Sequence, residues 1–149
     1  MTNTLTQKKL YIASDHAGFD LKRTLIQEAL ATKYGFEFVD LGPMNADRVD
    51  YPDFSAKVVS KIIADPFAIG VLICGSGQGM AMSANRHKGI RAALAWNEES
   101  AKLSREHNNA NVLCLGARLI EPALAGKILE SFLSAKFEGG RHSGRIEKF

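Results

Sequence analysis

The chain passes from a buried strand to a helix within residues 67–85, FAIGVLICGSGQGMAMSAN. The apolar run over residues 67–73 predicts a strand buried on both faces, and residues 80–85 predict a helix. Between them, a glycine-spaced loop places the thiol of Cys74 beside backbone amides that have little side-chain cover. Amides without intrahelical partners at the start of a helix, together with the helix dipole, attract an anion. The stretch therefore predicts a strand–loop–helix unit that binds a phosphate, a carboxylate or a developing oxyanion.

The spacing within this loop differs from that of several common phosphate and nucleophile loops. A dinucleotide-binding loop needs its third glycine at the position of Met80, and a P-loop needs a lysine, which does not occur between Cys74 and Asn85. A serine-hydrolase elbow needs glycine where Cys74 stands, and a cysteine-phosphatase loop needs arginine at Met80. These comparisons disfavour NAD binding and ATP hydrolysis. Taken alone, Cys74 is either a reactive thiol or an inert buried cysteine.

Composition limits the classes of protein that the chain can belong to. Its 149 residues, 46% of them hydrophobic, are enough for one core, so a single domain over residues 1–149 is expected. The net charge is +3, but the basic residues are scattered among acids, which disfavours a nucleic-acid partner. No apolar stretch approaches the roughly 20 residues of a membrane span, and the polar start lacks a signal-peptide core. We therefore expect a cytoplasmic protein without a membrane partner.

The two cysteines and four histidines favour neither a disulfide nor a zinc site. Cys74 and Cys114 both fall at the ends of predicted internal strands, which is typical of reduced thiols. No group of cysteine and histidine has the spacing of zinc ligands. No metal site is expected.

Strand-like and helix-like segments alternate along the whole chain, with short connections. This alternation predicts an α/β fold, a three-layer αβα sandwich around a five-stranded parallel sheet of the Rossmann or flavodoxin-like type. The strands are expected over residues 9–14, 36–41, 67–74, 90–95 and 111–115, and the helices over residues 21–30, 52–63, 80–85, 98–107 and 122–136.

Polar side chains gather where the first and third strands end. In a flavodoxin-like sheet, the ligand lies beyond the carboxyl ends of the strands, at the switch point between these two. The first strand is followed by Asp15 and His16, and the third ends in Cys74. A carboxylate, an imidazole and a thiol across one crevice are sufficient for acid/base chemistry on a small anion. The alternatives are a helix-capping role for Asp15 and a solvated turn for His16.

Eight short motifs spread over nearly the whole chain point to a family. They are SDHAG over residues 14–18, DYP over 50–52, CGSGQG over 74–79, AN over 84–85, GIR over 89–91, SREHNN over 104–109, NVL over 111–113 and GGRH over 139–142. In this order they resemble the ribose-5-phosphate isomerase B family, with its galactose-6-phosphate isomerase relatives.

The resemblance implies an aldose–ketose isomerase without metal or cofactor, which interconverts D-ribose 5-phosphate and D-ribulose 5-phosphate in the pentose phosphate pathway. Cys74 matches the base that moves a proton between the two carbons, through an enediolate. His107 matches the residue that opens the furanose ring, and Asp15 would share that step. The enediolate oxygens would contact the Ser76 hydroxyl and the loop amides, those of Gly75, Gly77, Gln78 and Gly79.

The resemblance also assigns the remaining contacts to substrate. Asn108 would bind sugar hydroxyls, and the phosphate would be held by His16, Arg141 and Arg145, with Arg118 as a further candidate. Judged only from its position at a helix end, His107 would be structural. Arg141 and Arg145 are four residues apart, so a helical turn would place both on one face, although they can equally form a solvated tail. Members of the family form homodimers or dimers of dimers with shared active sites.

Two other functions stay open. Many family members with the cysteine base carry threonine at the position of Ser76, and a smaller side chain leaves room for a six-carbon sugar phosphate, such as allose or galactose 6-phosphate, or for a free aldose. Another branch uses a glutamate at the position of Met80, so this chain matches the thiol branch. The second alternative is a flavodoxin-like module that binds a phosphate or a nucleotide without catalysis.

Overall fold

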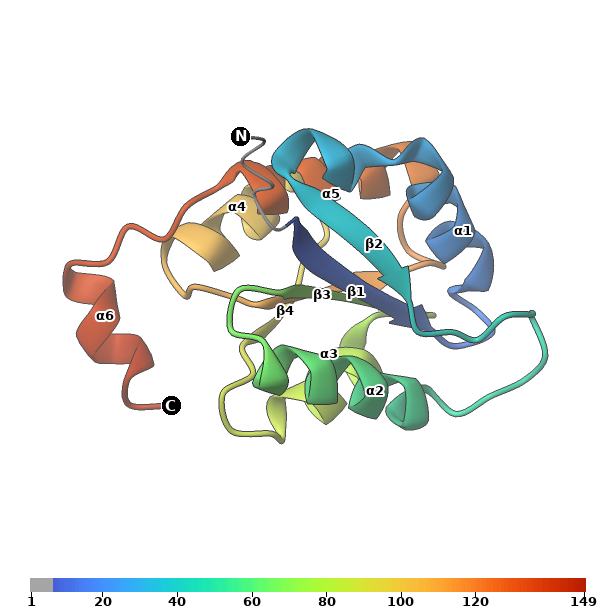
Figure 1. The fold of residues 1–149 in the computed structure, drawn as a ribbon, viewed down its shortest axis with the longest axis horizontal. Coiled ribbons are helices and arrows are strands. Elements are labelled where there is room, and N and C mark those ends of the chain that lie inside the picture. The colour runs from blue at the N-terminus through green and yellow to red at the C-terminus, as the bar shows by residue number, and fades with distance from the viewer. Residues whose placement is uncertain (1–6) are drawn as a thin grey trace, which may run out of the picture.

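The computed structural model describes residues 7–149, and its five strands form one parallel sheet with the order β2-β1-β3-β5-β4 (Figure 1). This architecture confirms the predicted α/β class. The strands are β1 (Lys8–Ser14), β2 (Phe36–Asp40), β3 (Ile69–Cys74), β4 (Ala92–Leu94) and β5 (Val112–Gly116).

The strand order differs from the flavodoxin order 2-1-3-4-5 at one edge, because β5 lies between β3 and β4. Burial is consistent with the exchange. All five residues of β5 are buried, whereas the three residues of β4 are only partly buried. The more apolar strand therefore takes the inner place. In the middle of the sheet, β1 and β3 are neighbours, with Ser14 opposite Ile73. The predicted pairing of the first and third strands is therefore confirmed.

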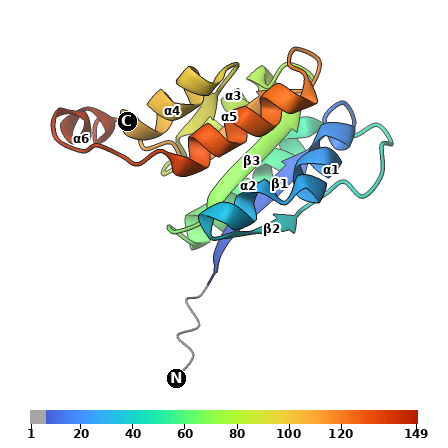
Figure 2. The ribbon, with the colours of Figure 1, turned by 90° about the horizontal axis from the view of Figure 1, so that it is seen from above.

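Helices cover both faces of the sheet, as predicted (Figure 2). One face packs against α1 (Phe19–Glu28), α4 (Glu98–Glu106) and α5 (Pro122–Ser134). The other face packs against α2 (Tyr51–Ala64) and α3 (Gln78–Asn85). Side chains alternate between these two cores, since Leu10 and Ile12 of β1 face the first and Ala13 the second.

Several segment boundaries differ from the sequence prediction, and β4 is shorter than expected at both ends. The helix expected over residues 21–30 ends at Glu28, because Ala29 has φ 52°, and a 3-10 helix, η1 (Leu30–Tyr34), follows. The strand expected from residue 67 begins at Ile69, since Phe67 is 75% exposed. The last predicted helix ends at Ser134, and a separate helix, α6 (Arg141–Ile146), carries the C-terminal arginines.

Within residues 7–149, no helix has both the length and the apolar character that crossing a bilayer requires.

The side chain of Lys22 is a buried anchor for the segment that follows β2. It is 0% exposed, and its Nζ atom lies 2.8 Å from Asp40 Oδ1 and 2.6 Å from the carbonyl oxygen of Pro43. These bonds join α1 to the chain beyond β2. The charged amine needs these partners, because a buried ammonium without a counter-charge is costly.

We expect Lys22→Ala to lower the free energy of unfolding by about 3 kcal/mol, because Asp40 loses its partner and a buried space is left empty. Urea denaturation measures the change. The matched control is Lys9→Ala, whose ion pair with Glu37 is exposed and should change stability little. Equal effects of the two substitutions would contradict the anchoring role of Lys22.

Candidate functional site

Cys74 ends β3 at the carboxyl edge of the sheet, and its thiol is held by the loop that follows. The side chain faces the α2–α3 core, and the residue is only 4% exposed. The backbone N–H of Gly77 donates to Cys74 Sγ at 3.2 Å, and the N–H of Gln78 donates to Ser76 Oγ at 3.4 Å. The amide N–H of Gly77 therefore holds the sulfur atom in place just before the start of α3.

The turn between Cys74 and α3 depends on glycine at position 77. Gly77 has φ 78°, in the left-handed region that favours glycine, and it precedes the first residue of α3. A Cβ atom at this position would lie 2.5 Å from Leu94 Cδ1. The predicted strand–loop–helix unit is therefore confirmed, and β4 packs closely against its turn.

Arg118 lies over the same loop, although it belongs to the segment after β5. The N–H of Ala117 donates to the Cys74 carbonyl at 2.9 Å, and the N–H of Arg118 donates to the Gly75 carbonyl at 3.0 Å. Arg118 Nη1 lies 3.2 Å from the position that a Cβ of Gly75 would occupy. The guanidinium is thus brought to the edge of the loop, where its charge can serve an anion.

Asp15 and His16 follow β1 at the same edge, as predicted. The N–H of Asp15 donates to the Ile73 carbonyl at 3.1 Å, which attaches this segment to the end of β3. The carboxylate of Asp15 is largely buried and accepts the N–H of Gly18 at 3.0 Å, in the turn just before α1, whose first turn has no side-chain cap. His16 Nδ1 lies 3.2 Å from the carbonyl oxygen of Val49 and 3.3 Å from its nitrogen.

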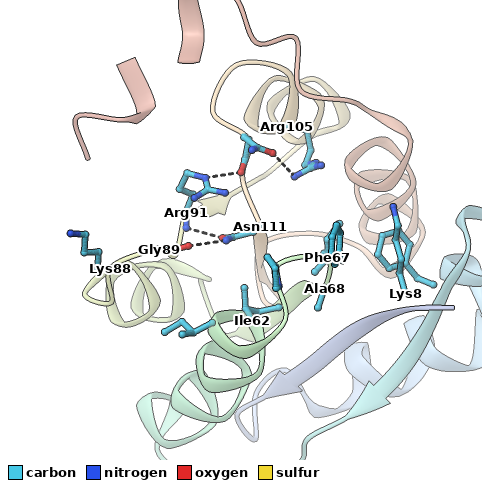
Figure 3. A pocket seen from close by; sticks show the side chains of 14 residues that line it. Lys8, Ile62, Phe67, Ala68, Lys88, Gly89, Arg91, Arg105 and Asn111 are labelled. Atoms are coloured by element: carbon cyan, nitrogen blue, oxygen red, sulfur yellow. Dashed lines mark hydrogen bonds between the residues drawn. The ribbon is translucent and has the colours of Figure 1, made fainter. Parts of the chain in front are cut away.

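His107 and Asn108 do not join these residues within one chain. His107 follows α4, which runs back toward the amino ends of the strands. There, Arg105 and Asn109 line a cavity of about 420 Å³ together with Lys8 and Ile69, the first residues of β1 and β3 (Figure 3). Strand β3 has six residues, which at about 3.3 Å per residue separate its two ends by about 17 Å. His107 therefore lies near the opposite edge from Cys74.

The C-terminal arginines also lie away from the thiol. Arg141 and Arg145 are both in α6, so the helical turn that would place them on one face is present, and both side chains are exposed. In Figure 1, α6 extends beyond α4, on the side opposite the arrowheads of β1 and β2. Asn108 faces a groove whose other lining residues include Leu94 and Trp96. His107 stacks on His142 of α6, the helix that carries Arg141 and Arg145, whereas Asn108 faces the groove beside β4.

The arginines of the amino-edge cavity stabilise the turn that follows His107. Arg91 Nε donates to the Asn109 carbonyl at 2.8 Å, and Arg105 Nη1 bonds the Ala110 carbonyl. Asn109 has φ 47°, so this turn needs outside support. Burial lowers the pKa of Arg91, and burial followed by the charge of Arg91 lowers that of Arg105. These contacts give the two arginines a structural role.

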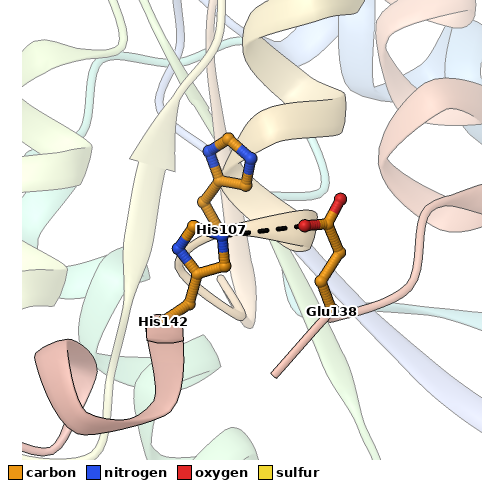
Figure 4. Close-up of side chains that lie close together, drawn as sticks. All are labelled: His107, Glu138 and His142. Atoms are coloured by element: carbon orange, nitrogen blue, oxygen red, sulfur yellow. Dashed lines mark ion pairs between the residues drawn. The ribbon is translucent and has the colours of Figure 1, made fainter. Parts of the chain in front are cut away.

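A cluster of His107, Glu138 and His142 was not revealed by the sequence pattern (Figure 4). The rings of His107 and His142 are stacked, with centroids 4.4 Å apart and an interplanar angle of 15°. His142 Nε2 lies 3.6 Å from Glu138 Oε2. Burial is the largest cause of a lowered pKa of His142, followed by the neighbouring charge of His107. The sequence offered one signal for this cluster, because His142 directly follows Arg141 in the GGRH motif.

The second cysteine is distinct from the first. Both thiols are free, but Cys114 is 0% exposed within β5. Burial, with a smaller contribution from Cys74, raises the pKa of the Cys114 thiol. Cys114 is therefore a core residue, whereas Cys74 lies at a strand end beside a loop of polar groups.

Comparison with known proteins gives consistent matches over nearly the whole chain. A model described as Ribose/Galactose Isomerase matches residues 10–149. Ribose-5-phosphate isomerase B of Escherichia coli strain K12 is 39% identical over 140 residues, which cover 94% of this chain and 93% of that protein.

Two solved structures have closely similar folds. A ribose 5-phosphate isomerase from Thermotoga maritima has a TM-score of 0.89 and 47% identity, covering 95% of this chain and 96% of that one. Ribose-5-phosphate isomerase B from Mycoplasma genitalium, with bound ribulose-5-phosphate, has a TM-score of 0.88 and 48% identity, covering 94% of this chain and 92% of that one.

Proposed function

Because the chain belongs to the ribose/galactose isomerase family and is an aldose–ketose isomerase, we propose that it interconverts D-ribose 5-phosphate and D-ribulose 5-phosphate. The observation that supports this reaction best is the geometry at Cys74. A thiol that receives an amide N–H lies at the end of β3, where the backbone of Asp15 is bonded to Ile73 and Arg118 lies against Gly75. Residues 1–149 would act as one isomerase domain.

Cys74 is the proposed base of the proton transfer. In the open-chain aldose, its thiolate takes the proton from C2, and the electron pair of that C–H bond forms the C1–C2 double bond of an enediolate. The same proton is then returned to C1, while the proton of the O2 hydroxyl is transferred to O1, which gives the ketose. Atoms and electrons balance without an external oxidant or metal. A thiolate positioned beside the carbon is an effective base for such a step.

The enediolate oxygens need preorganised hydrogen-bond donors. The amides of Gly77 and Gln78 already donate to Cys74 Sγ and Ser76 Oγ, so they fix the shape of the loop. We therefore assign the oxyanion contacts to the Ser76 hydroxyl and to the amides of Gly75 and Gly79, with Gly77 and Gln78 as supporting residues. Gly79 lies in the first turn of α3, where amides lack intrahelical partners.

We infer that a second copy of the chain completes the site. Three large apolar side chains follow the carboxyl ends of β2, β4 and β5, and they are strongly exposed: Met44 at 71%, Trp96 at 64% and Leu119 at 70%. Exposed apolar side chains around one edge are typical of an interface. In such a homodimer, His107 of the partner subunit would open the furanose ring with Asp15, and Asn108 of the partner subunit would bind sugar hydroxyls.

The phosphate would then be bound from both subunits. His16 uses Nδ1 for Val49, so Nε2 is the ring nitrogen that can serve the substrate. Arg118 lies at the loop edge of the same chain. Arg141 and Arg145 of the partner subunit would add two guanidiniums from one helical turn. A dimer of dimers would keep the same shared sites.

The test is conversion of ribose 5-phosphate to ribulose 5-phosphate in excess EDTA, followed by NMR. We expect full turnover, because no step needs a metal. Substrate identity is decided by comparing kcat/KM for ribose 5-phosphate, allose 6-phosphate, galactose 6-phosphate and free ribose. Because the side chain of Ser76 is smaller than threonine, the six-carbon phosphates are the second candidates. Tight nucleotide or flavin binding without turnover of any of these sugars would instead support a non-catalytic binding module.

A further inference from the structure

We propose that His107, Glu138 and His142 bind one divalent transition-metal ion of the zinc class. Their ligand atoms all lie within 4.8 Å of one another. Two imidazoles and one carboxylate form a donor set that zinc uses in proteins, with a fourth position left for water. Imidazole nitrogen favours zinc, cobalt and nickel over magnesium and calcium, which prefer oxygen ligands alone. The cluster is therefore expected to discriminate between these two groups of ions.

The pair formed by Glu138 and His142 already has the separation that a metal requires. A tetrahedral ion with bonds of about 2.0–2.1 Å holds its donors about 3.4 Å apart. His142 Nε2 and Glu138 Oε2 are 3.6 Å apart, so they can bind one ion almost without moving. His107 must change its ring tilt, because the stacked rings are nearly parallel and a ligated imidazole points its lone pair at the metal.

The backbone around the cluster is positioned from two sides. The N–H of Glu138 donates to the Glu106 carbonyl at 3.0 Å, which joins the segment before α6 to the end of α4. The N–H of His142 donates to the Gly139 carbonyl at 3.1 Å, in a turn where Gly139 has φ 66°. His142 is 7% exposed, whereas Glu138 is exposed and can turn toward an ion. A bound metal would fasten α6 to α4.

The charges nearby limit the affinity. Arg141 and Arg145 lie close enough to His142 to oppose positive charge there, and Glu138 opposes this effect. We therefore expect binding weaker than that of a closed structural zinc site, with an ion that EDTA removes. The sequence shows no zinc spacing, because His107 and His142 are in separate segments that only the fold brings together.

The binding test uses metal-free full-length protein titrated with Co²⁺. We expect one equivalent per chain, the visible absorption of tetrahedral cobalt, and no charge-transfer band from a thiolate. Glu138→Gln, His142→Ala and His107→Ala should each weaken binding by at least about tenfold, since even changes next to a metal ligand cost that much. The matched control is Glu147→Gln, an exposed carboxylate at the end of α6 that is outside the cluster.

A second measurement distinguishes loss of the metal site from misfolding of a variant. Zn²⁺ should raise the Tm of the wild-type protein and of Glu147→Gln, but not that of Glu138→Gln, provided that the metal-free Tm values agree. Unchanged cobalt binding in Glu138→Gln would overturn the proposal. So would a thiolate band that disappears in Cys74→Ala, since the ion would then be bound at the other edge of the sheet.

The effect on turnover rests on the proposed function and is read separately. If His107 opens the sugar ring, Zn²⁺ should inhibit isomerisation of ribose 5-phosphate, EDTA should reverse the inhibition, and Glu138→Gln should stay active in Zn²⁺. Cobalt binding that is lost in the cluster variants but leaves turnover unaffected would support the metal site and reject the role of His107. A normal cobalt spectrum in a protein without any isomerase activity would leave the site intact and reject the proposed function alone.

Discussion

Cys74→Ala is expected to lower kcat for isomerisation by about 10³-fold, the typical contribution of a positioned general base. KM should change much less, because the thiol contacts a reacting carbon and not the phosphate. The measurement is steady-state formation of ribulose 5-phosphate. The loop should persist in this variant although the Gly77 N–H loses its sulfur acceptor, since the N–H bonds of Ala117 and Arg118 to the carbonyls of residues 74 and 75 do not involve the side chain.

The matched control is Cys114→Ala, which removes the other buried thiol from the same core. It should keep kcat close to the wild-type value while losing some stability, because Cys114 lies inside β5 and has no access to substrate. A Cys74→Ala protein with wild-type kcat would reject the thiol as the base. A rise in KM with little change in kcat would instead assign Cys74 to substrate binding.

Features that depend on nearby residues were predictable from the sequence. The apolar run of β3 and the glycines after Cys74 indicate a strand, a turn and a helix start within a few residues of one another. The same holds for Asp15 and His16, which follow β1 directly. Once the two strands were expected to be neighbours, their polar ends were expected at one edge.

Features that depend on pairing between distant segments were not predictable. The exchange of β4 and β5 is a property of the assembled sheet, in which β5 is buried and β4 only partly buried. The stack of His107 on His142 joins the end of α4 to α6, and no local periodicity indicates it.

A rare local conformation was not predictable either. The early end of α1 depends on a positive φ at Ala29, a conformation that alanine rarely adopts.

Mixed dimers test the sharing of sites between subunits, and the expected effect is recovery of activity from two inactive proteins. His107→Ala is expected to lower turnover of ribose 5-phosphate by at least about 10²-fold, because ring opening loses its acid/base group. The variant's loss should be smaller when the substrate is supplied in open-chain form. Cys74→Ala is inactive for a separate reason, the missing base.

In a dimer of one Cys74→Ala chain and one His107→Ala chain, shared sites give one site with both groups and one site with neither. Random exchange of subunits should therefore restore about one quarter of wild-type activity, since half of the dimers are mixed and each has one intact site. The matched control mixes Cys74→Ala with Asp15→Asn, whose positions lie at the same edge of the same chain, and should restore nothing. Recovery requires His107 of one chain to serve Cys74 of the other, because within one chain the length of β3, about 17 Å, separates the two groups. Mixtures that stay inactive after exchange is verified by mass would mean that each chain builds its site alone.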